Sequence, residues 1–96
     1  MKNLVEIHQQ EKEVSAVNLF ISELGTATAI QLERNGTLKE HITKTPALLL
    51  CVSGFVTYED ENEQEVKLES GDYVNITPNV KHWLYASVKS QLILLK

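Results

Sequence analysis

With 96 residues, the chain is long enough for one small domain, and its hydrophobic fraction of 43% allows a packed core. The net charge of −4 and the pI of about 5.3 argue against nucleic acid as a partner, because nucleic-acid-binding surfaces are basic. A single cysteine excludes a disulfide within the chain, which is consistent with a reducing compartment.

Residues 1–13 are expected to form an N-terminal extension of a single domain that spans residues 1–96. Leu4, Val5 and Ile7 can dock either as a short strand or as one helical turn, and the polar residues after them are typical of a solvated segment. The apolar patch is too short and too charged for a signal peptide or a membrane span. We therefore expect a soluble cytoplasmic protein.

The rest of the chain alternates between short stretches rich in β-forming residues and turn signals such as Asn35-Gly36. The predicted strands are residues 16–22, 26–33, 37–43, 47–52, 55–59, 65–69, 73–77, 82–87 and 91–95. Short strands at intervals of about ten residues predict an all-β sandwich or barrel.

Two of these stretches carry further expectations. Residues 47–52 are apolar on both faces, which predicts a central strand buried on both sides. The acidic residues 60–63 between two predicted strands indicate a solvated hairpin tip that discourages edge pairing. Their spacing does not match a calcium-binding loop.

Residues 71–83 are the stretch around which the predicted barrel is organised. A turn at Gly71 precedes an alternating strand in which Val74 and Ile76 share one face. Pro78-Asn79 ends that strand, and His82 follows directly after the turn. We expect this turn to present His82 at the mouth of a cavity, where a histidine can bind a metal, move a proton or donate a hydrogen bond.

This stretch resembles the second motif of the cupin superfamily, a group of small jelly-roll β-barrels. That motif runs glycine, five residues, then proline-x-glycine-x-x-histidine, and Gly71 and His82 stand at its two ends. Thr77 takes the place of the proline and Asn79 that of the glycine. Asparagine suits this position because it tolerates left-handed backbone better than most residues.

The first cupin motif, a glycine, His-x-His, a glutamate and a closing glycine, is matched more loosely. The residues in those places are Gly36, His41, Thr43, Ala47 and Gly54. Both motifs occur in order with a hairpin between them. The resemblance therefore implies one cupin-like jelly-roll barrel.

The same resemblance implies a metal site of three histidines and one glutamate, but the chain matches only His41 and His82. Thr43 replaces the second histidine and Ala47 replaces the glutamate. Two imidazoles do not close a zinc or iron site, so we expect no cofactor. A divalent transition metal on His41 and His82 is left open, with Cys51 as the third ligand that would complete it.

Alternation along the strands, placed by the motifs, predicts which side chains enter the barrel. The expected cavity is mostly apolar, and its ligand-binding residues are His41, Thr43, Leu49, Cys51, His82 and Leu84. His41 and His82 are either a functional pair or two ordinary hydrogen-bonded histidines. The first function expected is small-molecule binding. The alternative is a cupin-type enzyme, metal-dependent with an irregular site or metal-free with a histidine general acid/base.

The sequence also predicts a homodimer. Residues 16–22, 47–52 and 91–95 are apolar on both faces, whereas the outer faces of a lone two-sheet barrel should be polar. A second subunit packed sheet to sheet would bury the surplus. The competing explanation is that residues 1–13 fold back over the same face.

Overall fold

A computed structural model describes residues 2–9 and 12–96 of the chain. Within these residues the chain forms nine strands, which confirms the all-β prediction. They are β1 (Val14–Ser22), β2 (Gly25–Leu32), β3 (Thr37–His41), β4 (Ala47–Ser53), β5 (Val56–Asp60), β6 (Glu65–Leu68), β7 (Tyr73–Ile76), β8 (His82–Ala86) and β9 (Ser90–Leu95). None of the described residues forms a helix long and apolar enough to cross a membrane.

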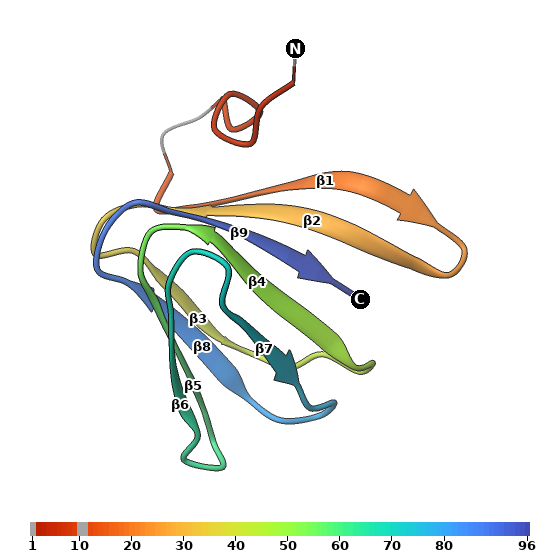
Figure 1. The fold of residues 1–96 in the computed structure, drawn as a ribbon. Coiled ribbons are helices and arrows are strands. Elements are labelled where there is room, and N and C mark those ends of the chain that lie inside the picture. Colours follow the sequence, from red (N-terminus) through yellow and green to blue (C-terminus); the bar gives the residue numbers. More distant parts are fainter. Residues whose placement is uncertain (1, 10–11) are drawn as a thin grey trace.

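The strands form two sheets that face each other across the core (Figure 1). The five-stranded sheet has the order β1-β2-β9-β4-β7, and the four-stranded sheet has the order β3-β8-β5-β6. Every pair of neighbouring strands is antiparallel. Strands distant in sequence lie side by side, as in a jelly roll, and the chain crosses repeatedly between the two sheets.

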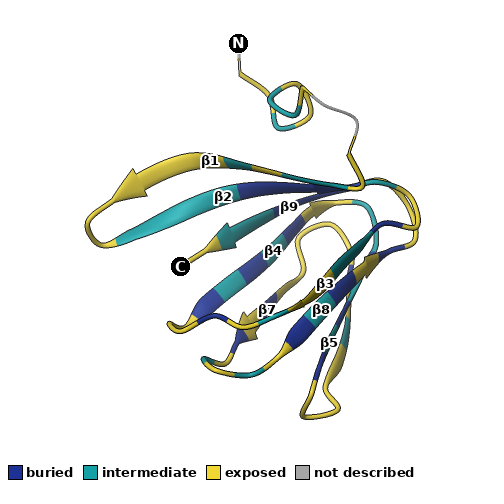
Figure 2. Ribbon diagram, turned by 180° about the vertical axis from the view of Figure 1, so that it is seen from behind, coloured by how far each residue is buried: buried dark blue, intermediate teal, exposed yellow. Residues whose placement is uncertain are grey.

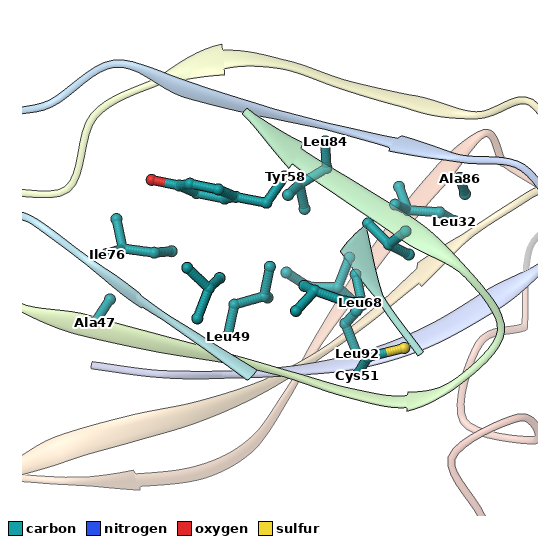
Figure 3. Packing of buried hydrophobic residues seen from close by; sticks show 13 residues of the cluster. Leu32, Ala47, Leu49, Cys51, Tyr58, Leu68, Ile76, Leu84, Ala86 and Leu92 are labelled. Atoms are coloured by element: carbon teal, nitrogen blue, oxygen red, sulfur yellow. The ribbon is translucent and has the colours of Figure 1, made fainter. Parts of the chain in front are cut away.

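The core lies between the sheets, where each strand contributes alternate residues (Figure 3). On β4 the inward residues are Ala47, Leu49 and Cys51, as predicted. On β7, Val74 and Ile76, which were predicted to share one face, are both buried. Each fully buried leucine or valine contributes about 1.5–3 kcal/mol of hydrophobic stabilisation, so this alternation fixes the register of the strands.

The outward residues of β4 differ from the prediction of a strand buried on both sides. Leu48 and Leu50 are only half-buried, and Val52 is exposed. The reason is that each sheet has a partner sheet on its inner face only. The apolar outward side chains of β4 therefore lie on an outer surface of the barrel.

The turn before β8 brings distant parts of the chain together. Asn79 has a φ of 65°, in the left-handed region, which explains why asparagine suits the place of the motif glycine. The Asn79 backbone N–H donates a 2.8 Å hydrogen bond to the Thr43 carbonyl oxygen. This bond ties the turn that precedes His82 to the segment between β3 and β4.

The described part of the N-terminal segment forms one turn beside β1 (Figure 1). The Ile7 backbone N–H donates to the Asn3 carbonyl oxygen at 3.2 Å, as in a single helical turn. His8 Nδ1 and Ser15 Oγ lie 2.7 Å apart, which anchors the turn to β1. Of the predicted extension over residues 1–13, residues 1, 10 and 11 lie outside the described residues.

Candidate functional site

The candidate site is a pair of histidines at one end of the barrel. His41 ends β3 and His82 begins β8, and the two residues are directly paired across these antiparallel strands. Their Nε2 atoms lie 2.9 Å apart, and their ring centroids lie 4.0 Å apart in an edge-to-face arrangement. The structure therefore brings together the histidine of the first motif, His41, and the histidine of the second motif, His82.

The hydrogen bonds of the other ring nitrogens determine which tautomers are present. Nδ1 of His41 lies 3.2 Å from the Lys39 carbonyl oxygen, and Nδ1 of His82 lies 3.2 Å from the Val80 carbonyl oxygen. A carbonyl oxygen can only accept, so both Nδ1 atoms must carry the hydrogen. In two neutral rings, both Nε2 atoms would then be bare acceptors that face each other.

Two bare acceptors at 2.9 Å repel, so the contact needs one further hydrogen. Either the pair holds one extra proton between the Nε2 atoms, or one ring changes tautomer and loses its carbonyl partner. In chemical terms the pair is therefore an acceptor site. It is satisfied by a proton or by a group that donates a hydrogen bond.

The two rings differ in their exposure to water. His82 is 1% exposed, whereas His41 is half-buried. Burial lowers the pKa of His82 and His41 lowers it further, while the Val80 carbonyl and the Asp60 carboxylate act in the opposite direction. Its burial therefore disfavours a positive charge on His82.

A small apolar void lies between the sheets next to this pair. Its lining residues come from both sheets and are Ile30, Leu38, His41, Leu49, Ile76, His82, Leu84 and Leu94. Four of the predicted ligand-binding residues are thus brought together: His41, Leu49, His82 and Leu84. The void measures about 10 Å³, which is room for about one water molecule.

Thr43 and Cys51 do not line this void in the described part of the chain. Thr43 is buried, and its Oγ1 has no hydrogen-bond partner among the described residues. Cys51 packs beside Leu92, away from the end of the core where Ile76 lies (Figure 3). Its Sγ donates to the Ser53 carbonyl oxygen at 3.6 Å, and burial raises the pKa of the thiol.

Tyr58 and Asp60 lie beside His82 and were not predicted as site residues. The Tyr58 ring stacks on the His82 ring with a centroid distance of 5.7 Å. The Tyr58 hydroxyl donates to Asp60 Oδ2 at 3.0 Å, and burial together with this carboxylate raises the pKa of Tyr58. Asp60 is paired across the strands with His82.

The prediction that residues 60–63 form a solvated tip is wrong for Asp60, which is 6% exposed. Asp60 Oδ1 accepts the backbone N–H groups of Asn62 and Gln64, at 2.9 and 3.1 Å, and so organises the hairpin turn. Asp60 thus caps the turn and holds Tyr58, and in the described residues it makes no hydrogen bond to either imidazole.

The residues present do not fit a complete metal centre. Within residues 2–9 and 12–96, no group of three or more histidine, cysteine, aspartate or glutamate side chains is placed to hold a metal ion. Cys51, the third ligand considered from the sequence, packs elsewhere in the core, and Ala47 offers no ligand atom. Structural and catalytic zinc sites use at least three protein ligands, whereas this pair of histidines supplies two.

Comparisons with known proteins bear on the fold. No protein-family model matches the chain, and no curated protein matches it. Solved structures do. A cupin superfamily protein from Desulfitobacterium hafniense has a TM-score of 0.84 and 14% identity, covering 97% of this chain and 84% of that one. A conserved protein of unknown function from Streptococcus pyogenes has a TM-score of 0.82 and 16% identity, covering 99% and 83%.

A cupin-like protein from Thermotoga maritima is also similar, with a TM-score of 0.77 and 22% identity, covering 86% of this chain and 67% of that one. These similarities, together with the two antiparallel sheets, show that the chain has the cupin fold. The fold predicted from the two motifs is therefore confirmed. Because unrelated activities share this fold, the function has to be argued from the site.

Proposed function

We propose that the protein binds a small organic molecule at the mouth of the barrel through the pair His41 and His82. The observation that carries the proposal is the 2.9 Å contact between two Nε2 atoms whose rings both face backbone carbonyls through Nδ1. This arrangement leaves hydrogen-bonding capacity that the described side chains do not satisfy. A ligand with a hydroxyl group, or a carboxylic acid that brings its own proton to the pair, would satisfy it.

The surroundings suit a ligand whose remaining surface is apolar. Apart from the histidines, every residue that lines the void is leucine or isoleucine. Because the void holds only about one water molecule, an organic ligand must displace side chains at the mouth. Leu38 and Leu94 are half-buried there, and the register of β3 against β8 shifts between Leu38 and His41. We expect β3 to move when a ligand enters.

The alternative, an enzyme in which a histidine acts as general acid or base, has less support. Both rings are oriented by backbone carbonyls, and the carboxylate of Asp60, which is paired across the strands with His82, is occupied by Tyr58 and by the hairpin turn. A catalytic imidazole is normally oriented and charged by such a carboxylate. Binding is therefore the function that the geometry supports best.

The test is a nuclear magnetic resonance screen of the full chain against small carboxylic acids and alcohols with apolar bodies. Ligands that shift the imidazole signals of His41 or His82 should bind the wild type and lose binding in His41→Ala and His82→Ala. His8→Ala is the matched control, because His8 contacts Ser15 in the N-terminal segment and should leave binding unchanged. Equal binding by all three variants would place the ligand elsewhere.

A further inference from the structure

The outer face of the five-stranded sheet carries a buried polar pair. Gln31 on β2 and Gln91 on β9 lie directly opposite each other and are 3% and 5% exposed. Gln91 Nε2 donates a 2.7 Å hydrogen bond to Gln31 Oε1. Both side chains alternate with the core residues Leu32 and Leu92, so they point away from the opposite sheet. The outer face of such a sheet is ordinarily open to water, so another part of the chain must cover this pair.

The N-terminal turn lies on this outer side of the sheet (Figure 1). Ile7 shares a surface hollow with Ser15 and Val17, two outward residues of β1. Ala29, which is paired with Val17 on the same outer face, is 1% exposed. Figure 2 shows the second half of β2, from Ala29 to Leu32, as buried. The turn therefore covers outer-face residues that the barrel alone would leave open to water.

One side-chain contact fastens the turn to β1. His8 Nδ1 and Ser15 Oγ lie 2.7 Å apart. His8 Nε2 is buried and has no hydrogen-bond partner in the part of the chain that the structure describes. A neutral ring can place its single hydrogen on Nδ1 and leave Nε2 bare, whereas an imidazolium carries a hydrogen on both nitrogens. Protonation would therefore bury an N–H group without an acceptor, together with a charge.

The charges around His8 also disfavour the imidazolium. Burial lowers the pKa of His8, and Lys89 lowers it further. The carboxylates at the neighbouring ends of β1 and β2 have other partners. Glu13 Oε2 accepts the Thr37 backbone N–H at 2.8 Å, and Glu33 Oε1 lies 3.9 Å from Lys89 Nζ. The charged residues of the segment itself, which form no ion pair with His8 within residues 2–9 and 12–96, are Lys2, Glu6 and Lys12.

We infer that His8 is a pH-sensitive latch: the neutral ring holds the N-terminal turn against β1, and protonation releases the turn and uncovers Gln31 and Gln91. The released ring has water at both nitrogens, so the open form takes up a proton that the closed form excludes. Opening also lets water reach Gln91 Oε1, a buried acceptor that is unpaired among the described residues. The segment lies outside the hydrophobic core, so it can open without global unfolding.

The direction of the pH dependence follows from this linkage. The closed form is favoured above about pH 6.5, the ordinary pKa of histidine. Burial lowers the pKa of His8 in the closed form. As the pH falls from 6.5 toward that lower pKa, the ratio of open to closed molecules should rise by up to about tenfold per pH unit.

The test measures how far solvent reaches the covered residues of the full chain. A neutral paramagnetic relaxation agent is added, and methyl signals are followed by nuclear magnetic resonance between about pH 8 and about pH 5. The relaxation of the Ala29 methyl group should be enhanced little at the higher pH. The enhancement should rise as the His8 imidazole titrates, while the methyl groups of Leu49 in the core stay protected.

Three variants separate the latch from other titrations. In His8→Gln the Ala29 enhancement should be independent of pH, because an amide does not titrate in this range. His41→Gln, the matched control, changes a histidine of the other sheet and should keep the wild-type rise. Ser15→Ala removes the contact to the ring and should raise the enhancement already at the higher pH.

Four results would overturn the inference. The first is a wild-type enhancement at Ala29 that does not change with pH. The second is a rise that persists in His8→Gln. The third is an enhancement that falls as the pH decreases, because the protonated ring would then have found an acceptor in the closed form. The fourth is a rise that Leu49 shares, which would mean global unfolding instead of release of the turn.

Discussion

His41 Nε2 and His82 Nε2 lie 2.9 Å apart while each ring directs Nδ1 toward a backbone carbonyl oxygen two residues earlier in the chain. The backbone thus fixes both rings and leaves one hydrogen-bonding position shared between them. The neighbouring strands β3 and β8 place the two residues opposite each other. The pair is the polar part of a void whose other lining residues are all leucine or isoleucine.

Stability should decrease as the pH falls below about 6.5, the ordinary pKa of histidine. Burial lowers the pKa of His82, so the unfolded chain takes up a proton that the folded chain excludes. The contribution is fully present above pH 6.5 and is lost as the pH decreases toward the folded-state pKa. Urea unfolding between about pH 8 and about pH 5 measures the slope, which cannot exceed about 1.4 kcal/mol per pH unit for each proton.

His82→Gln should flatten this slope. His8 contributes in the same direction, because burial lowers its pKa with help from Lys89, so some dependence should remain. His8→Gln is therefore the matched comparison. If the slope is unchanged in His82→Gln, proton exclusion at His82 is not a source of stability.

Substitutions of Tyr58 and Asp60 should lower the free energy of unfolding more than substitutions at a solvated hairpin tip would. Asp60→Ala removes the acceptor of three hydrogen bonds and should destabilise the fold by about 2–4 kcal/mol. Tyr58→Phe removes one of these bonds and should cost about 1–2 kcal/mol. Glu65→Ala, at an exposed position of β6, should stay within about 0.5 kcal/mol of the wild type. Urea denaturation that ranks Asp60→Ala with Glu65→Ala would restore the solvated-tip interpretation.

Period-two alternation, with the inward face assigned from the two motifs, predicted which strand faces are buried. It put Val74 and Ile76 on one face of β7, the face that is buried, and it put His82 and Leu84 inside the barrel on β8. Alternation works here because the inner and outer environments of a sandwich differ for successive residues of a strand. It also predicted the apolar outer residues of β4, although not that they stay partly exposed.

The site was less predictable than the fold. Alternation shows which face of a strand is buried, but not how far along the barrel an inward side chain lies. Cys51 points inward as expected but lies beyond the void that Leu49 lines. Asp60 continues the inward series of Val56 and Tyr58, and this pattern was the available signal for its burial. The acidic residues that follow Asp60 favoured a solvated hairpin tip instead, so the burial of Asp60 was not predicted. The void's small volume depends on how side chains from both sheets interlock, which no single strand reveals.

Of the two motif glycines with positive φ, Gly54 should be harder to replace than Gly71. At Gly54 the φ is 102°, and a Cβ would overlap Ser90 Oγ and lie 2.6 Å from Ser90 Cβ. At Gly71 the φ is 92°, but a Cβ would meet no atom within 4 Å. Gly71→Ala should cost about 1–2 kcal/mol through backbone strain, and Gly54→Ala should cost about 1–3 kcal/mol more through overpacking. Equal losses in urea unfolding would show that Ser90 moves away freely.

His41 and His82 should bind a divalent metal ion only weakly. Calorimetric titration of the full chain with Zn²⁺ should show weak binding, because His41 and His82 supply two protein ligands where closed sites use three or four. Any binding that is observed should disappear in His41→Ala, since a single remaining imidazole cannot chelate the ion. Cys51→Ser should change nothing, because Cys51 lies in another part of the core. Retention of about one metal per chain after dialysis would contradict the incomplete site, and its loss in Cys51→Ser would identify the missing ligand.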